Sequence, residues 1–286
     1  MQNIPIYIIS YNRLNVLKET IQSFLPFVDY SDLIIIDNTS DYQPLLDYYQ
    51  TLKDRGTKIF YNQKLEHAND LNSVSKFIDP ENKRRQCKYY VVTDPDISLK
   101  GVNKDFFKIC RYFLDNYPEV NIVGPMLKII DIPEEYPARE FVWKRHVDQF
   151  WHKEPSQEII FGKTVYFQPA KIDTTFGMLR AEKTYTRLLT GVRLYAPYEA
   201  LHLDWYITPK SMTKDQQDYS KKMGNNKISH WSGQYFTNAP KDALSKDERT
   251  IYVVENDKIQ THRLFNPYSL SNKVKQALSK LKDTLT

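Results

Sequence analysis

Short apolar runs alternate with amphipathic stretches in the first half of the chain. Near-continuous apolar runs at 4–9, 33–36, 57–61 and 89–93 predict four buried strands. Between these runs, apolar residues recur at helical spacing in 14–25, 45–52 and 68–78, which predicts three helices. Strands that are apolar throughout and alternate with helices are typical of a parallel sheet covered by helices on both faces. The pattern therefore predicts an α/β fold.

Polar residues follow these strands at the point where each strand ends. They are Asn12, Asp37, Asn62, Asp94 and Asp96. Because ligands of such sheets bind outside the carboxyl ends of the strands, we expect these side chains to line a site.

The second half of the chain is less regular. Residues 106–114 predict a helix and 121–123 a strand, while 161–167 and 172–179 predict two strands that could form a hairpin. Residues 131–158 are rich in charge, proline and tryptophan, which predicts a loop or an inserted segment. The chain has no internal repeat and no low-complexity linker, so one continuous domain is favoured over two.

The amino-acid composition excludes several classes of protein. With 41% hydrophobic and 26% charged residues in 286, a packed core is expected rather than disorder. Only eight glycines occur and no glycine-rich nucleotide loop is present, so the phosphates of a nucleotide would have to be held by a metal or by basic side chains. The net charge of +5 is too small to indicate nucleic acid.

Location is suggested by the cysteines and by the N-terminus. Cys87 and Cys110 are scattered and form no zinc pattern, which favours a reducing cytoplasm. The N-terminus lacks a signal-peptide pattern, and no run approaches 18 apolar residues, so no membrane span is predicted.

Asp94-Pro95-Asp96 directly follows a predicted strand. Two carboxylates there could hold Mg²⁺ or Mn²⁺, which would bridge the oxygens of a diphosphate. The alternative is a solvated turn, since Asp and Pro both favour turns. Asp37 could accept hydrogen bonds from a nucleobase or a ribose, or could instead cap a helix or an Asx-turn.

Three segments resemble the nucleotide-binding half of GT-A glycosyltransferases, especially family 2. They are IYIISYNR at 6–13, LIIIDNTS at 33–40 and YYVVTDPD at 89–96. The resemblance covers residues 1–125 and implies a Rossmann-like GT-A domain over 1–265, with an acceptor half at 126–265 that adds a smaller mixed region. It implies that Ser10, Tyr11, Asn12, Arg13 and Asp37 bind the nucleotide, and that Asp94 and Asp96 bind the metal and the donor diphosphate.

The resemblance also assigns residues whose match is weaker. Asn62 begins the segment 62–72, where the family has a nucleobase-lining motif, but here that segment lacks the family's glycine and arginine. Asp204 is the preferred catalytic base, and Asp173 is the second candidate. His230 would complete the metal shell, and Trp205 and Trp231 could stack on a sugar. Salt bridges, helix caps or core packing are the alternatives for these residues.

The implied activity is the transfer of a sugar from a nucleotide-sugar, with a UDP-sugar favoured, to a glycan or a lipid-linked acceptor in surface polysaccharide biosynthesis. Inversion is favoured, and a retaining transferase on the same fold is the alternative. A nucleotidyltransferase would normally show a glycine-rich basic loop after the first strand, which is absent here. A non-catalytic glycan-binding or scaffold protein is the alternative from another class.

Two sets of basic residues remain. Arg180, Lys183, Arg187 and Arg193 could bind a diphosphate or an anionic acceptor, although surface charge is the simpler interpretation. Residues 266–286 predict a basic amphipathic helix with an apolar stripe at Val274, Leu278, Leu281 and Leu285. Such a helix could dock on its own domain, or residues 271–286 could contact the inner face of the membrane.

Overall fold

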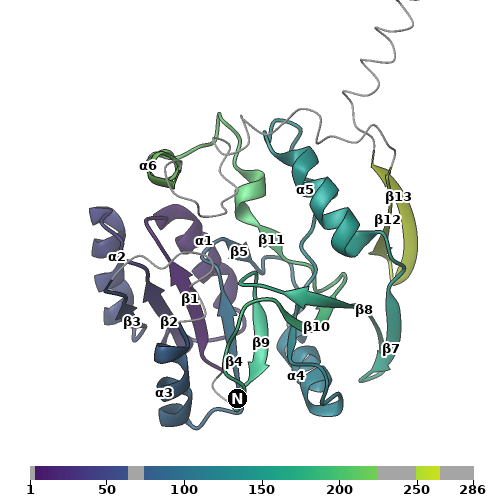
Figure 1. The fold of residues 1–286 in the computed structure, drawn as a ribbon, viewed down its shortest axis with the longest axis horizontal. Coiled ribbons are helices and arrows are strands. Elements are labelled where there is room, and N and C mark those ends of the chain that lie inside the picture. The colour runs from purple at the N-terminus through teal and green to yellow at the C-terminus, as the bar shows by residue number, and fades with distance from the viewer. Residues whose placement is uncertain (1–3, 64–73, 224–248, 265–286) are drawn as a thin grey trace, which may run out of the picture.

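The computed structural model describes residues 4–63, 74–223 and 249–264. Nine strands form one mixed sheet (Figure 1). In spatial order they are β3 (Lys58–Tyr61), β2 (Leu33–Asp37), β1 (Ile6–Ser10), β4 (Tyr89–Thr93), β9 (Gly177–Arg180), β6 (Ile122–Pro125), β10 (Leu189–Leu194), β8 (Lys163–Ile172) and β7 (Ser156–Ile160).

The first four strands run parallel, as the sequence predicts. Ile6 on β1 lies opposite Leu33 on β2 and Val91 on β4, so the carboxyl ends of these strands lie at one edge of the sheet. Strand β9 runs antiparallel between β4 and β6. The two predicted halves of the chain therefore share a single sheet.

Alternate residues of the strands face two different cores. Ile6 and Ile8 pack with α1 (Leu14–Phe24), α2 (Gln43–Asp54) and α4 (Phe106–Asn116). Tyr7 and Ile9 pack on the other face with α3 (Ser75–Arg85). Every residue of β1, β2 and β4 is buried, because each of these strands has helices on both sides. The predicted α/β class is confirmed.

Glycines allow the central strands to approach one another closely. A Cβ at Gly191 on β10 would lie 1.9 Å from the carbonyl oxygen of Ile122 on β6, and a Cβ at Gly177 on β9 would lie 2.2 Å from the Cδ1 of the same isoleucine. Glycine is therefore used here for close strand packing and not for a phosphate loop.

Two predictions for the second half are wrong. Residues 131–158 contain α5 (Arg139–His146), followed by a π-helical turn (Val147–Trp151) and β7. Val142 and Trp151 are buried there, but the charged residues around them obscure the helical spacing. The expected hairpin of 161–167 with 172–179 is also absent, because β8 runs on to Ile172 and pairs with β7 and β10. The turn of the β7–β8 hairpin is Phe161-Gly162, with φ of 50° and 77°.

The predicted helix at 68–78 is only partly comparable. The described helix α3 begins at Ser75 and continues to Arg85 with Pro80 inside it, whereas residues 64–73 lie outside the described ranges. Three elements near the site had no counterpart in the sequence analysis: β5 (Ile97–Ser98), β11 (Leu201–His202) and α6 (Lys214–Met223). The hairpin of β12 (Arg249–Glu255) and β13 (Lys258–Leu264) was also not predicted. In the ranges that the structure covers, no helix combines the length and the apolar character needed to cross a bilayer.

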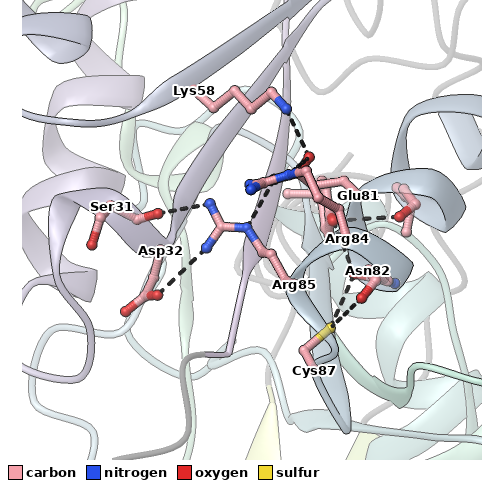
Figure 2. A network of polar contacts seen from close by, with 10 residues as sticks. Ser31, Asp32, Lys58, Glu81, Asn82, Arg84, Arg85 and Cys87 are labelled. Carbon is pink, nitrogen blue, oxygen red and sulfur yellow. Dashed lines mark hydrogen bonds and ion pairs between the residues drawn. The ribbon is translucent and has the colours of Figure 1, made fainter.

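The opposite edge of the sheet carries a network of charges centred on Glu81 of α3 (Figure 2). Its carboxylate accepts hydrogen bonds from Lys58 Nζ at 2.7 Å, from Arg84 Nη2 at 2.6 Å and from Arg85 Nε at 2.9 Å. Arg85 also donates to the carbonyl oxygen of Ser31 at 2.9 Å. These contacts join the C-terminal end of α3 to the starts of β2 and β3, which are the amino ends of the parallel strands.

Candidate active site

Asp96 and Asp204 lie more than one hundred positions apart in the chain but meet at the carboxyl edge of the sheet. Strand β5 follows the Asp94-Pro95-Asp96 turn and pairs with β11, with His202 opposite Ile97. The backbone N–H of Leu203 donates to the carbonyl oxygen of Asp96 at 2.7 Å. This short pairing places Asp204, in the 3-10 helix Leu203–Tyr206, beside the turn.

Arg13 joins the two carboxylates. Its Nη1 donates to Asp96 Oδ2 at 2.7 Å, and its Nη2 donates to Asp204 Oδ1. All three residues are at most 5% exposed. The ring of Tyr219 on α6 lies 4.8 Å from the guanidinium carbon and covers it. Arg13 was predicted to bind the nucleotide, and the structure adds that its side chain turns inward toward the acids.

His202 is a site residue that the sequence analysis did not single out. Its Nδ1 lies 3.8 Å from Asp96 Oδ2, and its ring stacks on Trp205 at 4.6 Å between centroids. Burial lowers the pKa of His202 and so favours the neutral ring, which is the form that binds metals. The signal in the sequence was the spacing of His202 and Asp204, two positions apart in one motif.

Burial and mutual repulsion give Asp96 and Asp204 different pKa values. Burial raises the pKa of Asp204 to about 7, and the charge of Asp96 adds to this effect while Arg13 opposes it. Burial also disfavours ionisation of Asp96, but the charge of Arg13 and its hydrogen bond to Asp96 hold the pKa of Asp96 below the ordinary value. Two carboxylates this close do not both ionise readily. Of the two carboxyl groups, Asp96 is therefore the stronger acid and Asp204 the weaker one.

The residues present fit a divalent cation. One ligand atom from each of Asp96, His202 and Asp204 lies within 4.8 Å of the others. The Oδ1 atom of Asp96 is buried and has no hydrogen-bond partner among the described residues, so it has a lone pair left for a ligand. Carboxylate oxygens with one imidazole nitrogen are a common donor set for divalent metals. Trp205, predicted as a sugar platform, is fully buried under His202 instead.

Asp94 belongs to a second polar cluster and not to this metal group. It accepts a hydrogen bond from the hydroxyl of Thr174, and its backbone N–H donates to the carbonyl oxygen of Thr174 at 2.6 Å. The adjacent Asp173 forms a two-point ion pair with Arg187, whose Nε lies 2.6 Å from Oδ1. Burial raises the pKa of Asp94, and the charges of Asp96 and Asp173 raise it further. The structure thus brings Asp94 and Asp173 together, but apart from the metal group.

The residues predicted to bind the nucleoside hold a loop at the same edge. Asp37 accepts hydrogen bonds from the Tyr49 hydroxyl at 2.8 Å and from the backbone N–H of Ser40 at 3.0 Å. The same Tyr49 hydroxyl also forms a hydrogen bond with Ser10 Oγ, at 3.0 Å. Asn12 accepts from the backbone N–H of Asp41 at 2.9 Å and has a positive φ of 51°. These side chains therefore shape the loop after β2.

Two other predicted nucleotide contacts lie nearby. Tyr11 packs against Tyr219 at 6.2 Å between ring centroids. The backbone N–H of Asn62 donates to the carbonyl oxygen of Asp37 at 2.9 Å, and its side chain contacts Asn38. The contact of these residues with a nucleotide stays a prediction.

Arg180 and Arg193 have structural partners. Arg180 donates to the carbonyl oxygens of Leu114, Pro118 and Val120. Arg193 is only 3% exposed and donates to the carbonyl oxygen of Pro125 at 3.0 Å, so interpreting it as a surface charge is wrong. Only Lys183, which is exposed, fits that interpretation. His230, Trp231 and the tail 266–286 lie outside the described residues.

Comparisons with known proteins concern the fold. No protein-family model matches the chain, and no curated protein matches it in sequence. The mannosyltransferase PcManGT from Pyrobaculum calidifontis, in complex with GDP-Man and Mn²⁺, is 15% identical over 63% of this chain and 45% of its own, with a TM-score of 0.37. S. aureus TarS 1–349 is 11% identical over 79% of this chain and 67% of its own, with a TM-score of 0.41.

A cytidylyltransferase from Leptospira borgpetersenii is 10% identical over 64% of this chain and 62% of its own, with a TM-score of 0.33. The chain thus spans less than half of the mannosyltransferase and about two thirds of the other two. The roles of individual residues follow from the geometry of this chain.

Proposed function

We propose that the chain is a metal-dependent glycosyltransferase that transfers a sugar from a nucleotide-sugar, with a UDP-sugar favoured, to a hydroxyl of a glycan or a lipid-linked acceptor. The observation that carries this proposal is the meeting of Asp96, His202 and Asp204 at the carboxyl edge of the sheet, beside the buried cation of Arg13. Buried carboxyl groups with separated pKa values are typical of a catalytic site.

Asp96 and His202 would hold the metal, and diphosphate oxygens and water would complete its coordination. Such a metal, when bound, offsets the negative charge that develops on the departing diphosphate. Asp204 would accept the proton of the attacking hydroxyl, and a pKa of about 7 suits a general base at neutral pH. A base in this position favours inversion of the anomeric carbon. Asp94 and the Asp173–Arg187 pair would contact the donor sugar.

The acceptor and the location rest on the sequence resemblance alone. We include in the proposal an acceptor of surface polysaccharide biosynthesis, a cytoplasmic location and peripheral membrane contact through 271–286. The division into halves at 1–125 and 126–265 likewise stays a prediction.

Thermal unfolding with UDP or GDP, each with and without Mn²⁺, tests the proposal. We expect the midpoint to rise with a nucleoside diphosphate and Mn²⁺ together, because a ligand that binds only the folded state stabilises it. Asp96→Asn should remove the part of the shift that depends on Mn²⁺. Asp47→Asn is the matched control, since this carboxylate is exposed on α2 and should leave the shift unchanged.

Hydrolysis of a panel of nucleotide-sugars then identifies the donor, and NMR of the product gives its anomeric configuration. A chain that shows no shift with either nucleotide and hydrolyses no donor is not a glycosyltransferase. A retained configuration at the anomeric carbon would contradict the role of Asp204 as the base.

A further inference from the structure

Arg13 occupies an unusual position for a residue predicted to bind a nucleotide. It precedes α1 as the N-cap residue, yet its side chain is 5% exposed and contacts two acids of the metal group. We propose that Arg13 is a positioning residue that couples the two ligands of the site: it balances Asp96 and Asp204, so that a divalent metal binds tightly only together with a nucleoside diphosphate. This inference rests on the proposed function.

The first argument is the charge within the group. Arg13 contributes one positive charge against one or two negative charges from Asp96 and Asp204, and neutral His202 adds none. A divalent cation held by Asp96 and His202 would lie close to the guanidinium of Arg13, which already bonds to Asp96 and Asp204. In a buried site, such repulsion is stronger than in water. A metal that binds alone is therefore repelled by the charge of Arg13, and it competes with Arg13 for the carboxylate of Asp96. Both effects weaken its binding.

The second argument comes from two polar atoms of the same group. Arg13 Nε and Asp96 Oδ1 are buried, and neither has a hydrogen-bond partner among the residues that the structure describes. Nε–H is a donor, which suits an anion, whereas the carboxylate oxygen is an acceptor, which suits a cation. The group thus lacks one anionic and one cationic partner at once. A diphosphate and a metal arriving together supply both.

A diphosphate would also neutralise the excess positive charge of a site that holds both Arg13 and a metal. Its oxygens carry enough negative charge to balance the metal and Arg13 together, and one of them could accept from Nε. By linkage, a diphosphate that strengthens metal binding is itself bound more tightly by the same factor when the metal is present. The coupling should therefore be visible from either ligand.

The experiment measures Mn²⁺ binding at neutral pH, from the EPR signal of the free ion, with and without saturating UDP. For the wild-type chain we expect UDP to tighten Mn²⁺ binding about 10- to 100-fold, within the usual range of coupling between ligands. Arg13→Gln should bind Mn²⁺ without UDP about 10-fold more tightly than the wild type does, and UDP should then add little. Isothermal titration of UDP with and without Mn²⁺ should give the same coupling factor.

Arg84→Gln is the control, because it breaks an arginine–carboxylate pair with Glu81 at the opposite edge of the sheet, away from Asp96 and Asp204. It should keep the wild-type coupling. Arg13→Lys keeps the charge and should retain coupling above that of Arg13→Gln, so it serves if the glutamine variant does not fold. Folding of each variant is checked by circular dichroism.

Two results would overturn the inference while leaving the proposed function intact. One is a wild-type chain that binds Mn²⁺ equally tightly with and without UDP. The other is a folded Arg13→Gln chain that binds UDP but shows the wild-type Mn²⁺ affinity or a weaker one. By contrast, a chain that binds neither UDP nor GDP with Mn²⁺ present would refute the proposed function itself.

Discussion

The environment of Asp204 determines the chemical role that its carboxyl group can have. It is buried, it lies against Asp96, and its pKa is raised to about 7, so it can take up a proton where an exposed aspartate would not. We predict that Asp204→Asn lowers kcat about 10²- to 10⁴-fold, because the amide cannot accept the proton of the acceptor hydroxyl. Binding of UDP with Mn²⁺, measured by calorimetry, should stay near the wild-type value.

Asp173→Asn is the comparison variant, since Asp173 is the other candidate base. Its carboxylate already accepts two hydrogen bonds from Arg187, so we expect its loss to raise the KM for the donor more than it lowers kcat. An Asp204→Asn chain that loses Mn²⁺ binding together with kcat would identify Asp204 as a metal ligand and contradict its role as the base.

From the sequence, individual residues such as Asp96 and Asp204 could be chosen as candidates for the site. Which of them contact one another could not be predicted. Asp96 follows a buried strand, and Asp204 precedes an aromatic, so both could be selected as candidates. Their contact depends on the pairing of β5 with β11, which involves only two residues on each strand and leaves no periodic pattern. The inward turn of Arg13 and the place of His202 both follow from that pairing. Neither was predictable before the pairing was known.

Among the elements, the closely packed strands β6, β9 and β10 lead to a prediction about stability. Gly191 lies opposite Ile122, and a Cβ there would lie 1.9 Å from a backbone oxygen that cannot move aside without separating the strands. We predict that Gly191→Ala lowers the free energy of unfolding by about 1–3 kcal/mol or more, as overpacking does. Chemical denaturation measures this loss.

Thr190→Ala is the control on the same strand, because Thr190 is exposed and should change stability by less than about 0.5 kcal/mol. Equal stability of Gly191→Ala and the wild type would mean that β6 and β10 are farther apart than described.

Uniform burial made three of the central strands predictable. Strands β1, β2 and β4 are buried along their whole length, so their apolar runs were complete. Helix α5 has charged residues on much of its surface, and its buried residues alone did not reveal it. Phe161 was assigned to a strand because it is apolar, although its positive φ places it in a turn, where asparagine or glycine is more usual.

The molecule as a whole separates its candidate site from the charge network around Glu81. The candidate site lies at the carboxyl edge of the parallel strands, near α6 and β11 at the top of Figure 1. The network around Glu81 lies at the amino edge, where α3 ends and β2 and β3 begin (Figure 2). A substitution in this network should therefore change the stability of the fold without changing ligand binding.

Glu81→Gln tests this separation through the dependence of stability on pH. Hydrogen bonds from Arg84, Lys58 and Arg85 lower the pKa of Glu81 to about 2, against 4.5 for an unperturbed glutamate. A lowered pKa in the folded state stabilises the protein above pH 4.5, and this contribution disappears as the pH falls from 4.5 toward 2. Because Arg84 and Lys58 are well exposed, we expect a loss of only about 1–3 kcal/mol at neutral pH.

Urea denaturation of the wild type and of Glu81→Gln over a series of pH values should therefore show a difference at neutral pH that shrinks in acid. Glu119→Gln, at an exposed position, should follow the wild type throughout. The binding of UDP with Mn²⁺ should be the same for all three chains, because Glu81 lies at the edge opposite the site. A Glu81→Gln chain that is stable but has lost nucleotide binding would show that the two edges of the sheet are coupled after all.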